Sequence, residues 1–444
     1  MTLDTVPLLD IDPLIDDPAT RIIVCCGSGG VGKTTTAAAL GVRAAERGRR
    51  AVVLTIDPAR RLAQSMGIDS LDNIPRRVDG IKATGDGELH AMMLDMKRTF
   101  DEIVEAHADA ERARAILSNP FYQSLSAGFA GTQEYMAMEK LGQLRARDEW
   151  DLIIVDTPPS RSALDFLDAP KRLGSFLDGK FIRLLMAPAK VGGRAGMKFL
   201  NVGMSMMTGT LGKLLGGQFL RDVQTFVTAM DTMFGGFRTR ADATYRLLQA
   251  PGTAFLVVAA PERDALREAA YFVERLAAEE MPLAGLVLNR VHHSGAARLS
   301  AERALAAAEN LEDDRIVDQE AGNEAVRDST VAPPEPTADP VSAAHPDSAV
   351  DPNSAVDPDS TADPDSTVDA VSAAPTVDAL TAGLLRLHAE RMRVLAREQR
   401  TRDRFTALHP EVAVAEVAAL PGDVHDLAGL RTIGDRLATG GSSA

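Results

Sequence analysis

The feature that most constrains this chain is a glycine-rich loop between an apolar strand and a helix. Residues 21–26 (RIIVCC) are short, apolar and β-branched, which is typical of a buried strand. Residues 33–47 favour a helix that ends at Gly48. The loop between them follows the pattern G-x-x-x-x-G-K-T, formed by Gly27, Gly32, Lys33 and Thr34. This unit predicts a parallel α/β sheet with the loop at the carboxyl end of a strand.

Such a loop binds phosphate groups. Its glycines let backbone N–H groups turn toward an anion, and the helix N-terminus adds its positive end. In this pattern Lys33 is expected to reach the β- and γ-phosphates, and the Thr34 hydroxyl is expected to ligate Mg²⁺. The sequence therefore predicts binding of ATP and magnesium by the following loop residues: Gly27, Ser28, Gly29, Gly30, Val31, Gly32, Lys33, Thr34 and Thr35.

The rest of the chain alternates apolar strands with helices. Further strands are predicted at 51–56, 151–156, 253–260, 285–289 and 412–420. Helical segments are expected at 89–117, 262–280, 384–404 and 426–437. Strands that are apolar on both faces belong to a sheet covered on both sides. The predicted fold is a doubly wound, mostly parallel sheet flanked by helices, as in P-loop nucleotide hydrolases.

Two acids stand at the ends of predicted strands. Asp156 ends the strand 151–156, where such folds place the carboxylate that holds Mg²⁺. Asp57 ends the strand 51–56 and has two readings from its spacing alone. It either orients the attacking water beside the γ-phosphate, or forms a turn before Pro58 without a catalytic role.

Two segments interrupt the alternation. Residues 170–250 are helical in pattern and rich in methionine, which predicts a helical insertion. Its methionines suit either ordinary packing or a surface for apolar partners. Residues 313–376 contain an acidic, proline-containing hexapeptide repeated four times, which predicts a disordered loop. The expected order is a flexible N-terminus, an ATPase domain, this loop and the rest of the domain: 1–20, 21–312, 313–376 and 377–444.

Composition narrows the partners and the compartment. The net charge of −15 argues against a general nucleic-acid binder. The two cysteines, Cys25 and Cys26, are adjacent, so a disulfide scaffold is excluded and a reducing compartment is favoured. No stretch resembles a signal peptide or a membrane span. The chain is therefore expected in the cytoplasm, without stable membrane insertion.

Three signatures in order resemble the ArsA-type ATPases, the family of arsenical-pump ATPases and tail-anchored-protein targeting factors. The first is the P-loop. The second is DPARRL at residues 57–62, which is similar to the family's switch I sequence DPAHSL. The third is DTPPSRSAL at residues 156–164, which resembles its switch II sequence DTAPTGHTL. The resemblance covers residues 20–310 and 378–444.

The resemblance implies functions for particular residues. It implies that Asp57 orients the attacking water, with Lys33 assisting catalysis, and that Asp156 and Thr34 hold the metal. It also implies that Glu262 contacts the nucleotide and that Asn289 recognises adenine. Helices near 170–250 form a hydrophobic client groove in the targeting members.

One departure from the family lies inside the loop. Members of the family carry a second lysine where this chain has Ser28, and that lysine reaches across a dimer to the partner's nucleotide. The cysteines that bind zinc or arsenite in family members are also missing. We therefore hypothesise a dimer, either of two copies or with a paralogue that keeps the lysine.

The predicted function is a magnesium-dependent, ArsA-like ATPase that acts as a dimeric conformational switch and handles a hydrophobic or membrane-protein partner. One alternative is an ATPase of the partition and septum-positioning (MinD/ParA-like) group. Those chains are shorter and usually lack a helical insertion after switch II. The other alternative is a regulatory ATP-binding module with weak turnover, which Ser28 motivates.

Overall fold

The computed structural model describes residues 7–57, 61–126, 132–158, 236, 239–323 and 376–439. The chain divides into two compact units, Met1–His293 with Leu395–Ala444, and Ser294–Val394. The first unit contains the sheet and the glycine-rich loop. Each unit is described by itself.

A single eight-stranded sheet forms the centre of the first unit, in the order β3-β4-β2-β5-β1-β6-β7-β8. All neighbouring strands run parallel except β3 and β4. This confirms the predicted doubly wound, mostly parallel sheet. The strand bounds are β1 Ile22–Cys26, β2 Arg50–Thr55, β3 Arg76–Arg77, β4 Glu88–Met93, β5 Leu152–Asp156, β6 Thr253–Ala259, β7 Leu283–Val291 and β8 Val414–Ala418.

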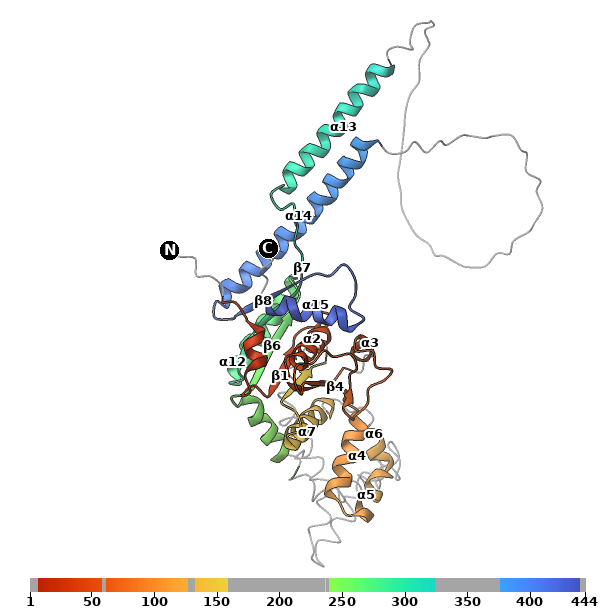
Figure 1. Ribbon diagram of the computed structural model, residues 1–444, viewed down its shortest axis with the longest axis vertical. Coiled ribbons are helices and arrows are strands. Elements are labelled where there is room, and N and C mark those ends of the chain that lie inside the picture. Colours follow the sequence, from red (N-terminus) through yellow and green to blue (C-terminus); the bar gives the residue numbers. More distant parts are fainter. Residues whose placement is uncertain are drawn as a thin grey trace, which may run out of the picture. The chain divides into compact units, whose positions relative to one another are not determined.

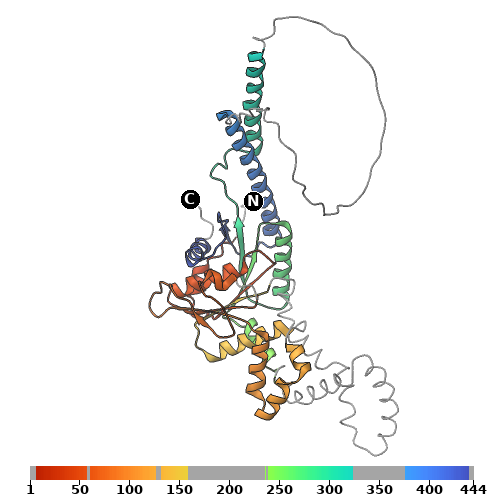
Figure 2. The same ribbon diagram turned by 90° about the vertical axis from the view of Figure 1, so that its right-hand side faces the viewer.

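Helices cover both faces of this sheet. In Figure 2, α2 (red) and α15 (dark blue) lie on one side of the sheet and α12 (green) lies on the other. The first unit holds α1 Ile11–Asp16, α2 Lys33–Glu46, α3 Arg61–Ser65, α4 Met96–His107, α5 Ala110–Leu117, α6 Pro120–Ser126, α7 Thr132–Arg147, α12 Arg263–Ala278 and α15 Leu427–Ala438, labelled in Figure 1 except for α1.

The two faces of the sheet bury separate apolar clusters, because successive side chains of a strand point to opposite sides. Val24 and Cys26 of β1 belong to the cluster on the α12 side, and Ile23 and Cys25 to the cluster on the α2 side. Both cysteines are free and buried, and burial raises the pKa of each thiol. They are therefore small core residues rather than reactive groups.

The N-terminal segment is more ordered than its sequence indicates. Residues 1–20 are predicted to be flexible, yet they include the helix α1, whose Ile11 and Ile15 are fully buried. The Asp10 side chain caps this helix by accepting a hydrogen bond from the backbone N–H of Asp12. Asp12 also forms an ion pair with Arg43 of α2. The prediction of a flexible segment is wrong for residues 7–20, since apolar and ionic contacts hold the helix.

The segment 89–117 also differs from its prediction as one amphipathic helical region. Its first part is the strand β4, which pairs in parallel with β2 from Arg50↔Glu88 to Thr55↔Met93. Asp95 and Asp109 then cap α4 and α5, which splits the remaining residues into two helices. Alternation of side chains in 88–93 is the short-range signal that the longer helical pattern conceals.

The second unit contains α13, from Ala301 to Asn323, and the first part of α14, Val377–Leu408. A small apolar cluster centred on Ala301, Ala304 and Ala389 joins the two helices. Because α13 continues to Asn323, it takes in residues 313–323 of the segment that the sequence assigns to the disordered loop.

Several predicted features lie outside the described residues. These are the repeat segment from 324 to 375, most of the Met-rich insertion, and parts of both switch sequences at 58–60 and 159–164. Of the insertion, residues 239–249 are described and are helical. None of the helices that the structure describes has the length and apolar character needed to cross a membrane.

Candidate functional site

The glycine-rich loop runs from the carboxyl end of β1 to the first residue of α2, as predicted. Gly27, with φ 146°, lies so close to β6 that an added Cβ would be 2.1 Å from the carbonyl oxygen of Val258. Gly32, with φ 97°, would place a Cβ 2.2 Å from Asn289 Nδ2. Only glycine fits at these two positions, because both the left-handed backbone and the space exclude a side chain.

Lys33 begins α2 and folds back over the loop. Its Nζ donates a hydrogen bond to the carbonyl oxygen of Ser28 at 2.8 Å, and its side chain is buried. Burial lowers the pKa of Lys33, while the nearby Asp156 and Asp57 carboxylates oppose that shift. The loop therefore surrounds an ammonium group that carries little hydration, which suits close contact with an anion.

Asp156 is fully buried at the end of β5. Its Oδ2 accepts hydrogen bonds from the hydroxyls of Thr34, at 2.7 Å, and Thr55, at 2.8 Å. Its Oδ1 has no hydrogen-bond partner. Burial raises the pKa of Asp156 to about 6, although both hydroxyls and the Lys33 ammonium favour the ionised form.

These oxygens fit a magnesium ion. Mg²⁺ takes oxygen ligands, often one or two carboxylates together with water and phosphate. Asp156 offers a buried oxygen without a partner, and the Thr34 hydroxyl lies beside it. In the part of the chain that the structure describes, no three His, Cys, Asp or Glu side chains form a metal cluster. The remaining ligands of a bound Mg²⁺ would therefore be phosphate oxygens and water.

Asp57 follows β2, is half-buried, and lies near Lys33 and Asp156. Its backbone N–H donates to the Thr55 hydroxyl at 3.2 Å, and that hydroxyl in turn donates to Asp156. The Asp57 and Asp156 carboxylates are close enough to repel each other, and both attract the Lys33 ammonium. The structure thus brings together Lys33, Thr34, Asp57 and Asp156, the four residues predicted for catalysis and metal binding.

A cavity of about 590 Å³ adjoins the other side of the loop. Asn289, near the end of β7, donates from Nδ2 to the carbonyl oxygen of Val31 at 2.8 Å. The other walls come from His292 and from the turn between β8 and α15, so the cavity is lined by Gly32, Thr35, Asn289, Arg290, His292, Ala418, Ala419, Leu420, Pro421, Gly422, Asp423, Val424 and Ile433. The recognition of adenine by Asn289 stays a prediction.

Glu262 is not brought into this cavity. It lies at the carboxyl edge of the sheet, between β6 and α12, and its side chain is exposed. It occupies the N-cap position of α12, yet its side chain makes no capping hydrogen bond. The contact of Glu262 with nucleotide stays a prediction.

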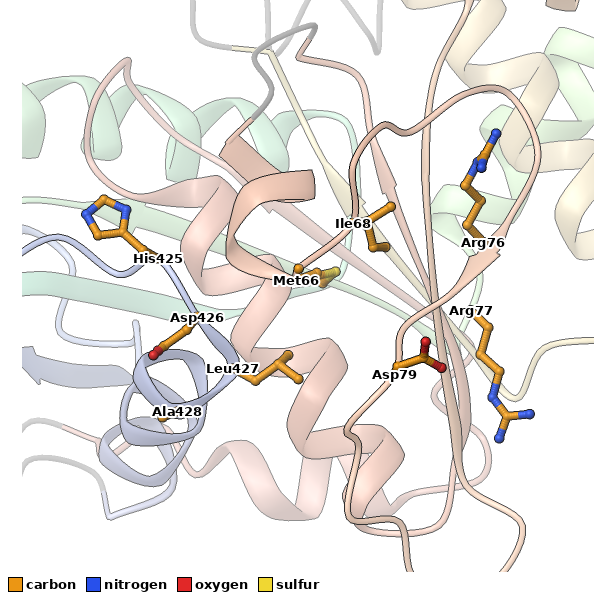
Figure 3. Close-up of a pocket in the computed structure, with 10 residues that line it drawn as sticks. Met66, Ile68, Arg76, Arg77, Asp79, His425, Asp426, Leu427 and Ala428 are labelled. Atoms are coloured by element: carbon orange, nitrogen blue, oxygen red, sulfur yellow. The ribbon is translucent and has the colours of Figure 1, made fainter.

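A second cavity, of about 700 Å³, lies beyond α3 and is shown in Figure 3. Met66, Ile68 and Leu427 form its apolar part, and no residue of the glycine-rich loop lines it. Arg76 and Arg77 stand at one end, where each forms an ion pair, with Asp72 and Glu88 respectively. Its cations are therefore neutralised and do not converge on one point, unlike the groups around Lys33.

Comparison with known proteins agrees with this geometry. The family model described as anion-transporting ATPase matches residues 20–316. This match covers the glycine-rich loop and the site residues described above as far as His292. The chain belongs to the anion-transporting ATPase family. Members of this family are ATP hydrolases.

Individual relatives of this chain are similar over different lengths. An "ATPase GET3" of Malassezia globosa is 28% identical over 172 residues, which cover 39% of this chain and 49% of the relative. An "ATPase GET3" of Podospora anserina is 25% identical over 287 residues, 63% of this chain and 76% of the relative. A "Putative arsenical pump-driving ATPase" of Halobacterium salinarum is 30% identical over 193 residues, which cover 41% of this chain and 28% of the relative. The match to the Malassezia protein thus spans about half of its length.

Several residues of this candidate site could not be found from the sequence. Thr55 links Asp57 to Asp156, and its signal is a hydroxyl at the last position of a buried strand. Gln133 of α7 donates from Nε2 to the carbonyl oxygen of Ile56 at 2.9 Å, next to Asp57. His292 belongs to no motif, and it contacts Glu398 at 2.6 Å. Residues 418–424 carry no motif, and only the fold places them beside Asn289.

Proposed function

We propose that this member of the anion-transporting ATPase family hydrolyses ATP with magnesium and uses hydrolysis as a conformational switch. The observation that carries this proposal is the hydrogen-bonded chain Thr34–Asp156–Thr55–Asp57. It connects the metal-ligand side of the loop to the first residue of the switch I sequence. A change of hydrogen-bond partner at Asp156 therefore changes the hydrogen bond of the Asp57 backbone N–H, because both involve the Thr55 hydroxyl.

Each residue has a proposed role. Lys33 neutralises the β- and γ-phosphates, and the N–H groups of the loop orient them. Asp57 positions the attacking water, since its carboxylate lies near both Lys33 and Asp156. Thr34 and Asp156 would hold a magnesium ion, which would supply charge stabilisation to the phosphates when bound. Asn289 forms the base side of the pocket.

The switch follows from the two neighbouring strand ends. Thr55 and Asp156 end β2 and β5, which are paired at Thr55↔Asp156. Rearrangement of the Asp156 hydrogen bonds alters the contact that holds Asp57 beside Thr55. Ordering and release of a segment by a phosphate group is a common way for such proteins to change state.

A test compares ATP turnover of the wild-type chain with magnesium and with excess chelator. We expect turnover only with magnesium, and loss of at least about a hundredfold in Asp57→Asn, if its carboxylate orients the water. Lys33→Ala is the control for lost phosphate binding, and its ATP affinity should fall. Turnover that persists in Asp57→Asn would refute the proposed water-positioning role.

The proposed assembly is a dimer, with a paralogous ATPase that carries the signature lysine as the preferred partner. Ser28 supports this preference, because its hydroxyl is too short and uncharged to reach a second nucleotide. Ser28 keeps its place in the loop through its carbonyl, which accepts from Lys33. If the purified chain alone dimerises and turns over ATP at full rate without a partner, the paralogue is unnecessary.

The hydrophobic or membrane-protein client remains part of the proposal. Its support is the methionine content of 170–250 and the family membership. Crosslinking of an apolar helical peptide to the full chain, with and without the insertion, tests it. Retained crosslinking after deletion, with nucleotide binding intact, would contradict a groove in this insertion.

A regulatory module with weak turnover is the second candidate function. The observation that favours it is Ser28. If no partner supplies a lysine to the site of this chain, the site would still bind ATP but would hydrolyse it slowly. Single-turnover kinetics with excess enzyme separates the two functions. A hydrolysis rate that remains low when a lysine-bearing partner is added supports the regulatory module.

A further inference from the structure

The base side of the proposed nucleotide pocket depends on an irregular strand end. β7 changes register against β8 between Asn289 and Val291, and Arg290 adopts φ 61° there. The Asn289 Oδ1 accepts from the N–H of Arg290 at 3.0 Å, while its Nδ2 reaches Val31. A non-glycine residue in this conformation costs free energy and persists only where the surroundings hold it.

One carboxylate holds the chain immediately after this bulge. Glu398 Oε2 accepts a hydrogen bond from the backbone N–H of His292 at 3.2 Å. Its Oε1 lies 2.6 Å from His292 Nδ1. A carboxylate that accepts both contacts requires the proton of the imidazole to be on Nδ1. Both oxygens of Glu398 thus fix one residue, in its backbone and in its ring.

Glu398 is itself in a rigid place. Its side chain is only 14% exposed. One turn further along α14, Arg402 forms an ion pair of 2.7 Å with Glu416 of β8. Phe405, on the next turn, is buried in the core. This end of α14 is therefore anchored to the sheet, and Glu398 presents its carboxylate from a fixed position.

His292 lines the same cavity as Asn289, Gly32 and the turn at 418–424. Glu398 does not line this cavity. We propose that Glu398 is a positioning residue for nucleotide binding: by holding His292, it shapes the base-side wall without touching the nucleotide. The inference rests on the proposed function. It adds Glu398, which lies 106 positions after His292 in the sequence.

Ligands with and without a base should respond differently to a change at Glu398. Groups at Lys33, Thr34 and Asp156 contact phosphate and metal, and Glu398 contacts none of them. Loss of the Glu398 contact should therefore weaken ligands that carry a base and leave the phosphate chemistry intact. Inorganic tripolyphosphate, which has the phosphates without the base, is the matched probe.

The experiment measures binding of Mg·ATP and of Mg·tripolyphosphate to the full chain by calorimetry. For Glu398→Ala we expect about tenfold weaker ATP binding and a KM raised by a similar factor, with kcat and tripolyphosphate binding unchanged. Glu398→Gln keeps one carbonyl oxygen and should have an intermediate effect. Glu390→Ala, at an exposed site on the same helix, is the control and should have none.

A double-mutant cycle identifies the route of the effect. His292→Ala and Glu398→Ala should each weaken ATP binding, and the double variant should lose clearly less than the sum of the two separate losses, because the two side chains act through one contact. Unchanged ATP binding in Glu398→Ala, or an equal loss of tripolyphosphate binding, would overturn the inference. A wild-type chain that binds tripolyphosphate but turns over no ATP would instead contradict the proposed function.

Discussion

At the scale of single residues, the site contains a carboxylate that folding alone disfavours. Asp156 is fully buried, and one of its oxygens has no hydrogen-bond partner. Without a cation, the ionised form is costly, because two hydroxyl donors and one ammonium replace its hydration incompletely. Function explains why the sequence keeps this acid, since a bound magnesium ion would complete its coordination.

Asp156→Asn should stabilise the metal-free protein at neutral pH. The folded pKa of about 6 lies above the unfolded value, so the folded state binds more protons between about pH 4 and 6. The contribution of Asp156 to wild-type stability should therefore fall as pH rises through that window, by up to about 3 kcal/mol. Urea unfolding at pH 4.5 and 7.5 checks this. The gain in stability of the variant over the wild type should therefore be larger at pH 7.5 than at pH 4.5, and an equal gain at both pH values would contradict it.

Gly32→Ala should lower the affinity for ATP more than Gly30→Ala does. Both glycines have positive φ, so both substitutions carry a backbone cost of roughly 1–2 kcal/mol. Only the Cβ at position 32 collides with the Asn289 amide, since position 30 has open space within 4 Å. Equilibrium dialysis with ATP separates the two effects. Equal losses of affinity would show that strain, not the collision, decides.

At the scale of elements, apolar strands were the most predictable part of the fold. Runs such as 151–156 and 253–260 correspond to β5 and β6, because burial on both faces leaves a continuous apolar pattern. Elements held by long-range contacts were not predictable in this way. α1 is too short for a sequence pattern, and its burial depends on α2 and α15, which follow later in the chain.

The packing of α1 gives a prediction at this scale. Ile15→Ala should destabilise the first unit by about 2–4 kcal/mol, because Ile15 is fully buried. Leu8→Ala is the control, since 64% of Leu8 is exposed and its loss should cost under about 0.5 kcal/mol. Chemical denaturation of both variants measures the difference. Equal stabilities would mean that α1 detaches without cost.

At the scale of the whole molecule, the sequence revealed the phosphate side of the site better than the base side. Lys33, Thr34 and Asp156 belong to short motifs whose spacing reports their chemistry. Residues of the base side come from β7 and, more than a hundred residues later, from α14 and the turn after β8. Only the strand order brings them together, so no local pattern marks them.

The proposed dimer is also a property of the whole molecule. Ser28→Lys should restore the lysine that completes a partner's site, and should raise ATP turnover of the chain alone by about tenfold or more. Ser28→Met is the control of similar length without charge. Steady-state turnover together with analytical ultracentrifugation in ATP checks both rate and assembly. Equal rates in the two variants would argue against completion across a dimer.

Thr55 has one hydroxyl hydrogen and two acceptors within reach. It donates to Asp156 at 2.8 Å, and the carbonyl oxygen of Asp57 lies 3.4 Å away. A rotation about one side-chain bond therefore redirects this hydrogen from the carboxylate to the switch backbone. The orientation of a single O–H bond thus records whether Asp156 needs a donor, and infrared spectroscopy of the carboxylate band would report it.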